Sequence, residues 1–461
     1  MRLGLTVSCT AIALSLAGGA RGAEAPSESL TQALSQAYTY NPQLLAQRAH
    51  LRATDEGVPQ ALSGWRPQVT FTGTVGRGVV TGSPTVSGTD VSKEYITPST
   101  LDFNVTQPVY TGGRVPALLQ EAEHNVVADR ARTAATEGQI LFNVAQAFLD
   151  VVEAQATVDL NINNESVLRR QLEATNDEFR VGQVTRTDVA QAESRLSLAT
   201  ASRVQAEGNL ETSRANYQRA VGHLPGKLVA PKEHLQLPGT LDEALALASQ
   251  NNPNVILADF SSKAGEDAVR ATRAQLMPTV SVIGDVNRTV DLGRLDQTTN
   301  EASLIARLTM PIYEGGNIYS QTRQAKETVT QLRDQLVDAR QAAVQLATRD
   351  WQTITAQKAN IIALNATIKA AAIALDGVRE EAKVGSRTIL DVLNAEQELF
   401  TDRVSLVQAQ HDLAVAEFDL SQQVGRLTAA DLKLPVTIYD PEQHYRAVRN
   451  KWIGFGNKTS Q

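Results

Sequence analysis

Cysteine is nearly absent from this chain of 461 residues, in which Cys9 is the only one. It lies in a segment with the features of a secretory signal peptide: a basic residue at Arg2, an apolar stretch over 3–16 and small residues after it. We expect residues 1–22 to be removed, which would leave a mature chain without a thiol. Acylation at Cys9 is disfavoured, because Thr10 is large for a lipoprotein site and the apolar stretch follows the cysteine. A retained anchor is disfavoured too, since the apolar stretch over 3–16 is shorter than the roughly 20 residues that a membrane-spanning helix needs.

Long apolar runs and basic clusters are also missing. No later run of apolar residues approaches the length of a membrane-spanning helix, so a chain that enters a membrane would have to do so as β-strands. The formal net charge of −7 is spread evenly, without the groups of Lys and Arg that neutralise phosphates. A nucleic-acid partner is therefore disfavoured. With aromatic residues at only 5%, the abundance of Ala, Gln, Leu, Val, Thr and Asn favours long helices packed through small side chains.

Motifs of catalysis and metal binding are not found. The sequence contains no nucleophile elbow, phosphate loop or zinc motif. We therefore expect a protein that is not an enzyme and that needs neither cofactor nor metal. Metal-ligand spacing is absent from the six histidines, which are His50, His124, His223, His234, His411 and His444.

What the chain does have is an internal duplication. Leu30-Thr31-Gln32-Ala33-Leu34 recurs from Leu241 onward, at an offset of 211 (241 − 30) that still holds when Pro67 recurs as Pro278. From Pro108 onward the offset is 203 (311 − 108). One insertion therefore lies between Pro67 and Pro108 in the first copy. We assign the first repeat to residues 23–230, the second to 231–435, and a loosely held polar tail to 436–461.

Each copy predicts the same four elements in the same order. Gly and Pro end the first helix, alternating apolar residues such as Val69 and Phe71 indicate a β-hairpin, and two helices follow. In the first copy we expect a helix over 27–63, a hairpin over 68–109, a long helix over 113–180 and a return helix over 185–222. In the second copy we expect the corresponding elements over 240–275, 279–310, 316–383 and 387–424.

The long helices, near 100 Å at about 1.5 Å per residue, need neighbours on two sides. In the second copy a heptad pattern runs from Ala325 to Leu346, and Trp351 continues a second apolar stripe one residue over. We interpret Trp351 as a packing residue rather than a substrate contact. Four strands are too few to close a barrel in a membrane, since known barrels have at least eight. The unpaired edges of an open sheet would be too costly in hydrocarbon, so strands from other copies would have to pair with them. Three copies would supply twelve strands around a water-filled lumen.

The duplicated order of elements, the Pro-x-Tyr-x-Gly-Gly segments at Pro108 and Pro311, the Asn-Pro pair of each first helix and the Val-Gly-x-x-Thr-x-x-Asp-Val tips resemble the TolC family of outer-membrane channel-tunnels. The resemblance covers about residues 27–435. It implies an α+β membrane protein: a homotrimer with a twelve-stranded β-barrel in the outer membrane, continuous with a periplasmic α-helical barrel. It also implies an exit duct for drug efflux or type I secretion. A periplasmic adaptor (a membrane fusion protein) would connect this duct to an inner-membrane transporter of the ABC or RND type.

The strand-to-helix junctions have a mechanical reading. Proline cannot donate to a sheet ladder, and paired glycines allow the unusual dihedrals of the turn. We expect a purely structural role for the six junction residues, which are Pro108, Gly112, Gly113, Pro311, Gly315 and Gly316.

The tips carry charge at equivalent positions. Asp188 and Asp391 suit the start of a helix as caps, and this is one interpretation of both. For Asp391 the resemblance adds a second one, an acidic ring at the periplasmic constriction. The next position of that ring is Asn394 here, which would leave three charges per trimer and a weaker cation site. The tip turns that would meet the adaptor comprise Val181, Gly182, Val384 and Gly385.

The resemblance further implies a latch. Arg387 matches an arginine that ties the second-copy tip to the first-copy tip, with Thr187 and Asp188 as its counterparts. The tyrosine that completes this latch is Ala382 here, so the closed state would be less strongly held. An exposed Arg387 without a fixed partner is the alternative. At the level of the whole protein, a periplasmic coiled-coil adaptor or structural spacer is the rival to the channel, although such a protein would not carry the strand pairs twice.

Overall fold

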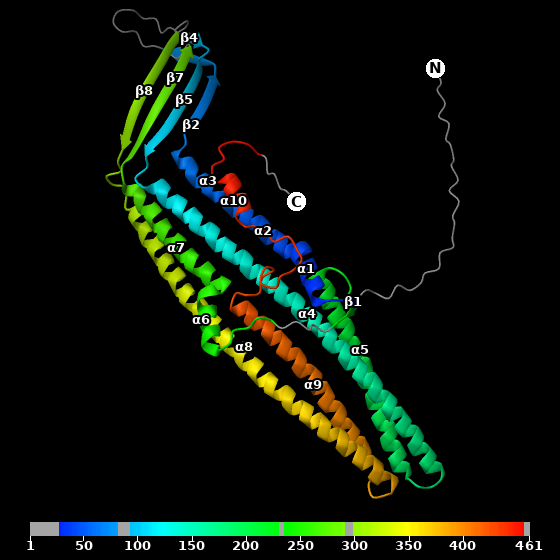
Figure 1. The fold of residues 1–461 in the computed structure, drawn as a ribbon. Helices are drawn as coiled ribbons and strands as arrows, with labels where there is room; N and C mark the ends of the chain where they lie inside the picture. Colours follow the sequence, from blue (N-terminus) through cyan, green and yellow to red (C-terminus); the bar gives the residue numbers. More distant parts are fainter. Residues whose placement is uncertain (1–26, 82–92, 230–234, 291–297, 456–461) are drawn as a thin grey trace, which may run out of the picture.

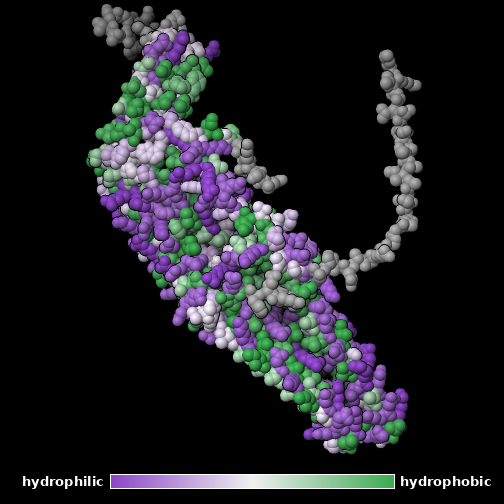
Figure 2. Space-filling model, viewed as in Figure 1, coloured by the Kyte–Doolittle hydropathy of each residue, from purple (hydrophilic) through white to green (hydrophobic). Residues whose placement is uncertain are grey.

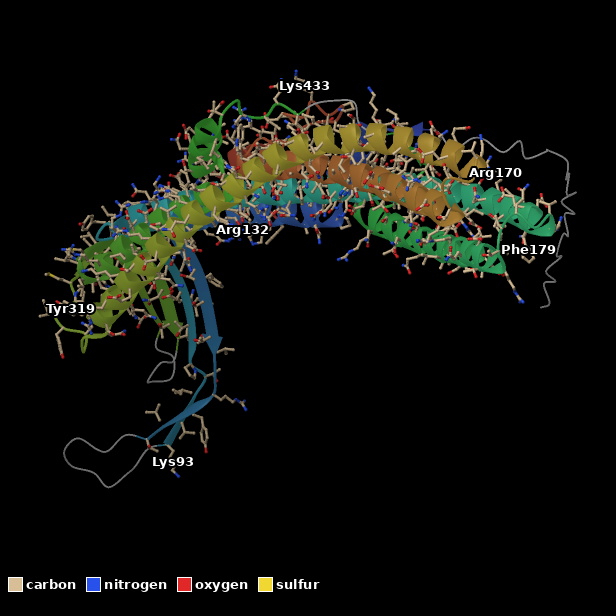
Figure 3. All side chains as sticks on the ribbon, turned by 90° about the horizontal axis from the view of Figure 1, so that it is seen from below. Lys93, Arg132, Arg170, Phe179, Tyr319 and Lys433 are labelled. Carbon is tan, nitrogen blue, oxygen red and sulfur yellow. The ribbon has the colours of Figure 1, made fainter. Side chains whose placement is uncertain are left out.

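The computed structural model describes residues 27–81, 93–229, 235–290 and 298–455. The molecule is elongated, with a sheet at one end and two helical hairpin tips at the other (Figure 1). Lys93 at the far end of the strands and Phe179 at a tip mark these two ends in Figure 3. The expected signal peptide, with Cys9, lies outside the described residues.

The elements that the two copies share occur in the same order. In the first copy they are β1 (Ser27–Glu28), α1 (Leu30–Tyr40), α2 (Pro42–Asp55), α3 (Gly57–Leu62), η1 (Ser63–Trp65), β2 (Gln68–Val75), β3 (Gly78–Thr81), β4 (Lys93–Ile96), β5 (Ser99–Tyr110), α4 (Arg114–Arg180), α5 (Arg186–Val221) and β6 (Lys227–Leu228). In the second copy they are α6 (Leu241–Asn251), α7 (Pro253–Arg273), η2 (Ala274–Leu276), β7 (Thr279–Val290), β8 (Thr298–Thr309), α8 (Asn317–Lys383) and α9 (Ile389–Gln423), and α10 (Gln443–Val448) follows.

The first helix of each copy is broken, so the prediction of continuous helices over 27–63 and 240–275 was wrong. Both copies break at an Asn-Pro pair, and the first copy breaks again at Glu56, between α2 and α3. Asn41 is extended (φ −63°, ψ 122°), and its side chain accepts the Gln43 N–H at 2.9 Å, which caps α2. Asn252 accepts the Asn254 N–H at 2.9 Å in the same way. A residue before proline avoids the helical region, and the asparagine side chain stabilises the new helix start.

The two hairpins merge into one antiparallel sheet in the order β2-β5-β7-β8, so the pairing of β5 with β7 joins the copies. The register puts Phe71 beside Phe103, and Phe103 beside Val286. Because side chains alternate along a strand, one face of the sheet is apolar and the other carries Thr, Asn and Asp. The apolar face comprises Val69, Phe71, Val75, Leu101, Phe103, Val105, Val280, Val282, Val286, Leu304, Ala306 and Leu308. Figure 2 shows hydrophobic surface over the strands.

The first hairpin is longer than the second. Beyond β2 and β5 it continues as the β3–β4 pair, which forms a separate two-stranded sheet. The second hairpin has no such extension among its described residues, which run to 290 and resume at 298. The insertion inferred between Pro67 and Pro108 is eight residues long (211 − 203), so it accounts for only part of this extension.

Small side chains let the long helices pack closely. The largest core cluster is centred on α4, where Phe148 and Tyr217 of α5 are fully buried with ring centroids 6.4 Å apart. In the second copy Trp351 packs against a cluster that includes Ala343 and Ala347. Within the described residues, α8 alone is long and apolar enough to cross a membrane by length and composition, with a mean hydropathy of 1.6 in its most apolar window. Polar residues interrupt this window, so it is not a continuous apolar run in the sequence.

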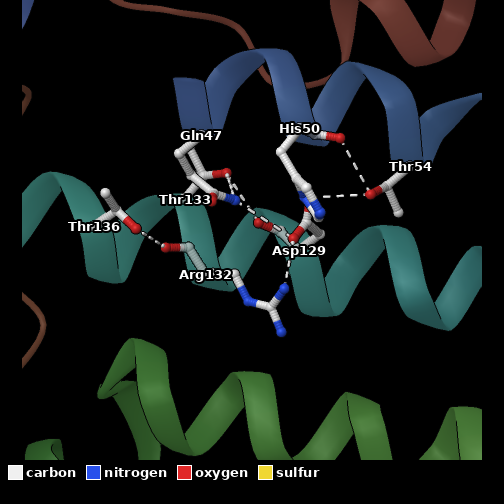
Figure 4. A network of polar contacts seen from close by, with 7 residues as sticks. All are labelled: Gln47, His50, Thr54, Asp129, Arg132, Thr133 and Thr136. Atoms are coloured by element: carbon white, nitrogen blue, oxygen red, sulfur yellow. Dashed lines mark hydrogen bonds and ion pairs between the residues drawn. The ribbon is translucent and has the colours of Figure 1, made fainter. Parts of the chain in front are cut away.

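Polar contacts fasten the outer helices to α4. Figure 4 shows Asp129 of α4 beneath α2, where its carboxylate binds His50 Nδ1 at 2.9 Å and accepts from Gln47 and Thr54 at 3.4 and 3.2 Å. The other described histidines also lie next to carboxylates. These pairs are His124–Asp267, His223–Glu28, His411–Asp150 and His444–Asp55. Each pair joins two separate segments, which gives these side chains a structural role.

The C-terminal segment is docked rather than loosely held, which corrects the expectation for residues 436–461 over its described part. The Tyr439 N–H donates to the Tyr38 hydroxyl at 3.0 Å, and Arg449 Nη2 donates to Glu123 Oε1 at 2.9 Å. The short helix α10 lies against α2 (Figure 1). Individual polar contacts hold this segment in place.

Candidate functional site: the helical tips and the strand junctions

The two tips have the same backbone. Gly182 and Gly385 both have φ +78°, a conformation that side chains with a Cβ rarely adopt. Val181 and Val384 precede them and are 70% and 80% exposed. Each tip therefore presents an apolar side chain on a tight glycine turn, at the end of the molecule farthest from the sheet.

Each return helix begins with a capping box. The Thr185 N–H donates to Asp188 Oδ2 at 2.9 Å, and the Asp188 N–H donates to Thr185 Oγ1 at 3.3 Å. Thr388 and Asp391 make the same contacts at 2.9 and 3.3 Å. The hydrogen bonds from Thr388, with a smaller contribution from the nearby Arg387, hold the pKa of Asp391 below its ordinary value. Asp391 is therefore ionised at neutral pH, and it caps its own helix whether or not it also faces a pore.

Asn394 has a partner that the sequence did not suggest. Arg195 Nη2 of α5 donates to Asn394 Oδ1 of α9 at 2.9 Å. Nearby, Leu393 of α9 is 1% exposed and packs with Leu168 of α4 and Ala192 of α5. The second-copy tip is thus attached to the first-copy tip by one hydrogen bond and one buried leucine.

Arg387 lies at the second-copy tip and binds within it. Its Nε donates to Glu381 Oε2 at 3.0 Å, between side chains that are about half exposed. Within the protomer the structure does not bring Arg387 to Thr187 or Asp188. Ala382, where the family pattern has tyrosine, packs against the small core of the second tip.

A buried ion pair supports this tip. Arg379 Nη2 of α8 binds Glu396 Oε1 of α9 at 2.8 Å, and the Glu396 side chain is 4% exposed. In the first copy, Arg203 of α5 binds Glu165 of α4 at 2.5 Å. Both pairs clamp a long helix to its return helix. Removal of Arg379 would leave the Glu396 carboxylate buried without this partner, which lowers stability.

The strand junctions differ between the copies. Pro108 lies inside β5 opposite Ser281, at a register shift that ends at Tyr110. Pro311 follows the end of β8 at Thr309, on the open edge of the sheet. All four junction glycines have positive φ, between +63° and +83°: Gly112, Gly113, Gly315 and Gly316. The expected mechanical role is consistent with this geometry.

Two tip residues were missed by sequence reasoning. Arg195 lies seven residues after Asp188 (195 − 188) and therefore on the same helix stripe, which is the one signal that could have indicated it. Glu381 lies six residues before Arg387 (387 − 381), across the glycine turn. No sequence spacing rule pairs residues across such a turn.

The comparisons with known proteins agree with this architecture. The family profile described as "Outer membrane efflux protein" matches residues 33–223 and 244–426. The chain is 35% identical over 434 residues to the outer membrane efflux protein BepC of Brucella suis biovar 1, which covers 94% of this chain and 93% of BepC. The chain belongs to the TolC family of outer membrane efflux proteins. It is also similar to TolC of Escherichia coli, with 25% identity over 438 residues, 91% of this chain and 86% of TolC.

Among solved structures, VceC of Vibrio cholerae has the same fold, with a TM-score of 0.76 at 18% identity, over 86% of this chain and 96% of VceC. As a TolC-family protein, the chain is located in the outer membrane, with a periplasmic tunnel, and it is an exit duct for efflux or type I secretion. Members of this family are channels rather than enzymes, and membership implies a trimer with pump or secretion partners. The rival interpretation as an adaptor or spacer is set aside.

Proposed function

We propose that this TolC-family protein works as a homotrimer in which twelve strands enclose the outer-membrane pore. A periplasmic adaptor would couple its tips to an inner-membrane transporter of the ABC or RND type. The observation that carries the proposal is that the protomer is open at both edges. The four-stranded sheet ends in β2 and β8, which have no neighbour on their outer sides within the described chain. Open strand edges in hydrocarbon cost several kcal/mol per unpaired group, so a barrel must close around them.

The helical layer is open in the same way. In the half of the molecule that carries the tips, α9 packs between α8 and α4, and α5 packs against α4, so α8 and α5 are the two outer helices of the layer. On α8, Val337, Ile362 and Ile373 are 51%, 73% and 66% exposed. On α5, Leu198 and Val204 are 56% and 55% exposed. These apolar faces would cover each other between neighbouring protomers, which also accounts for the apolar window of α8 that is only 6% buried in the protomer.

The tips would form the gate and the docking surface. Asp391 from three protomers would make an acidic ring, because its carboxylate is ionised and lies at the start of α9. The exposed turns at Val181 and Val384 would meet the adaptor. In the closed trimer, Arg387 would latch onto Thr187 and Asp188 of an adjacent tip, in competition with its pair to Glu381 of the same tip.

Single-channel conductance in planar bilayers tests this proposal. Arg387→Ser should raise the conductance, because it removes the charged contact between tips. Glu381→Gln is the matched control, since it removes only the pair within the tip and leaves Arg387 available to the latch. A rise with Arg387→Ser alone supports the latch. Equal changes in both variants would assign Arg387 to its own tip, and a monomer by mass measurement in mild detergent would contradict the channel assembly.

A further inference from the structure

The described part of the C-terminal segment ends in an exposed apolar cluster. Trp452, Ile453 and Phe455, called here the C-terminal cluster, are 65%, 89% and 109% exposed. Large apolar side chains at such exposure are unfavourable in water. The same segment is well anchored just before the cluster, through Tyr439 and Arg449 as described above. The cluster is therefore displayed by a docked segment.

Arg66 fixes the position of this cluster. Its Nη1 donates to the Lys451 carbonyl at 2.8 Å, and its guanidinium lies 4.9 Å from the centre of the Trp452 ring. Arg66 precedes Gln68, the first residue of β2, by two positions. The C-terminal cluster consequently lies at the level where the chain passes from helix to strand, and Figure 1 shows the red ribbon of the described C-terminal segment beside α3, below β2.

Other exposed apolar residues occur at the same level of the molecule. Trp65, Tyr110, Met277, Met310 and Tyr313 all lie within a few residues of the helix-proximal ends of the strands, with exposures of 37%, 46%, 39%, 57% and 81%. Membrane β-barrels carry aromatic side chains at this depth, where the lipid headgroups meet the acyl chains. The C-terminal cluster extends this girdle, by which we mean the five exposed side chains just named at the helix-proximal ends of the strands. In Figure 2 the hydrophobic surface of the strands and the C-terminal segment are visible on the same face.

We propose that the C-terminal cluster inserts into the periplasmic leaflet of the outer membrane as an interfacial anchor. The Trp452 ring would lie among the headgroups, where amphipathic aromatic rings are favoured, with Ile453 and Phe455 at the edge of the acyl chains. Arg66 would hold the ring at this depth and place its own charge near the lipid phosphates. Continuity with the girdle favours lipid as the occupant over a neighbouring protomer or another periplasmic protein. The inference uses the outer-membrane location and is independent of the gating proposal.

Tryptophan fluorescence of the full chain in vesicles tests this insertion. The chain contains three tryptophans, so Trp65→Phe with Trp351→Phe leaves Trp452 as the only tryptophan, which can be excited selectively over tyrosine. The vesicles contain phosphatidylethanolamine and phosphatidylglycerol whose acyl chains carry bromine near the headgroup. Insertion at the interface should lower the Trp452 emission by about twofold or more relative to unbrominated vesicles.

The matched control is a tryptophan placed elsewhere in the same segment. Ile438 is 55% exposed and adjoins Tyr439, which docks on α1 at the far end of α2 from the strands. Ile438→Trp, with all three native tryptophans changed to Phe, should show little quenching by bromine. Equal quenching at positions 438 and 452 would overturn the proposal. Protection of Trp452 from aqueous iodide without bromine quenching would also overturn it, because a protein surface would then cover the cluster.

A second variant guards against misfolding of the tryptophan mutants. Phe455→Cys, in a chain with Cys9→Ser and the native tryptophans, can be labelled with an environment-sensitive dye. A blue-shifted dye emission that brominated lipid quenches supports insertion. A water-like emission from a trimer of normal mass would refute it.

Discussion

The junction glycines give a sharp test of how the protomers close, because the two copies differ at one position. A Cβ added at Gly112 would lie 2.7 Å from Met277 Cβ and 2.8 Å from the Ala274 carbonyl oxygen. At Gly315, the equivalent position (112 + 203), a Cβ would meet nothing within 4 Å in the protomer. At the offset of 211, Ala274 and Met277 correspond to Ser63 and Arg66 (274 − 211 and 277 − 211). If β8 pairs with β2 of the next protomer as β5 pairs with β7, Gly315 will face Ser63 and Arg66 of that neighbour.

The size of the effect follows from two contributions. Alanine in the left-handed region costs about 1–2 kcal/mol. Insertion of an atom into a packed contact adds about 1–3 kcal/mol. Gly112→Ala should incur both contributions in the folding of the protomer. Gly315→Ala should incur only the cost of the left-handed conformation when the protomer folds. It should incur the cost of the packed contact when the trimer forms. The matched controls are Gly113→Ala and Gly316→Ala, which have φ of +83° and +79° and nothing within 4 Å of the added Cβ.

Two measurements separate these steps. The yield of refolded chain in detergent reports on the protomer, and it should fall for Gly112→Ala relative to Gly113→Ala. The temperature at which the trimer band converts to monomer on a gel reports on closure, and it should fall for Gly315→Ala relative to Gly316→Ala. Equal dissociation temperatures for these two second-copy variants would refute the inferred β8–β2 closure.

Two further predictions concern charges in the helical part. Asn394→Asp should tighten cation blockade of the pore only slightly, because Arg195 Nη2 lies 2.9 Å from Asn394 Oδ1 and would pair with the new carboxylate. The double variant Asn394→Asp with Arg195→Ala should tighten the blockade much more, as measured in bilayer recordings at low salt. Equal blockade in both would contradict this screening. Burial and the nearby Asp419 raise the pKa of Asp350 to about 6 despite the opposing effect of Arg349. The native state then binds more protons than the unfolded state between about pH 4 and 6, so the free energy of unfolding should fall as pH rises through that window. Asp350→Asn should flatten this dependence in chemical unfolding curves, and an unchanged slope would show that other groups cause it.

Local patterns were sufficient for much of the architecture. The duplication, the hairpins with Val69 and Phe71 on one face, and the long helices all follow from periodicities that the chain carries in itself, because strand and helix faces repeat every 2 and 3.6 residues. The glycine turns at Gly182 and Gly385 were also predictable, since their positive φ is a local requirement. The breaks at Asn41 and Asn252 are local as well, and the Asn-Pro pairs could have predicted them.

Only the tertiary structure decided the contacts between distant segments. The pairing of Arg195 with Asn394 and the clamp of Arg66 on the C-terminal segment join residues far apart in the chain, and neither leaves a periodic trace. Arg387 illustrates the same limit at short range, because its choice of Glu381 depends on how the turn aims two flexible side chains. Periodicity determines which face of an element is buried, whereas the partner that covers that face is determined by packing of the whole chain.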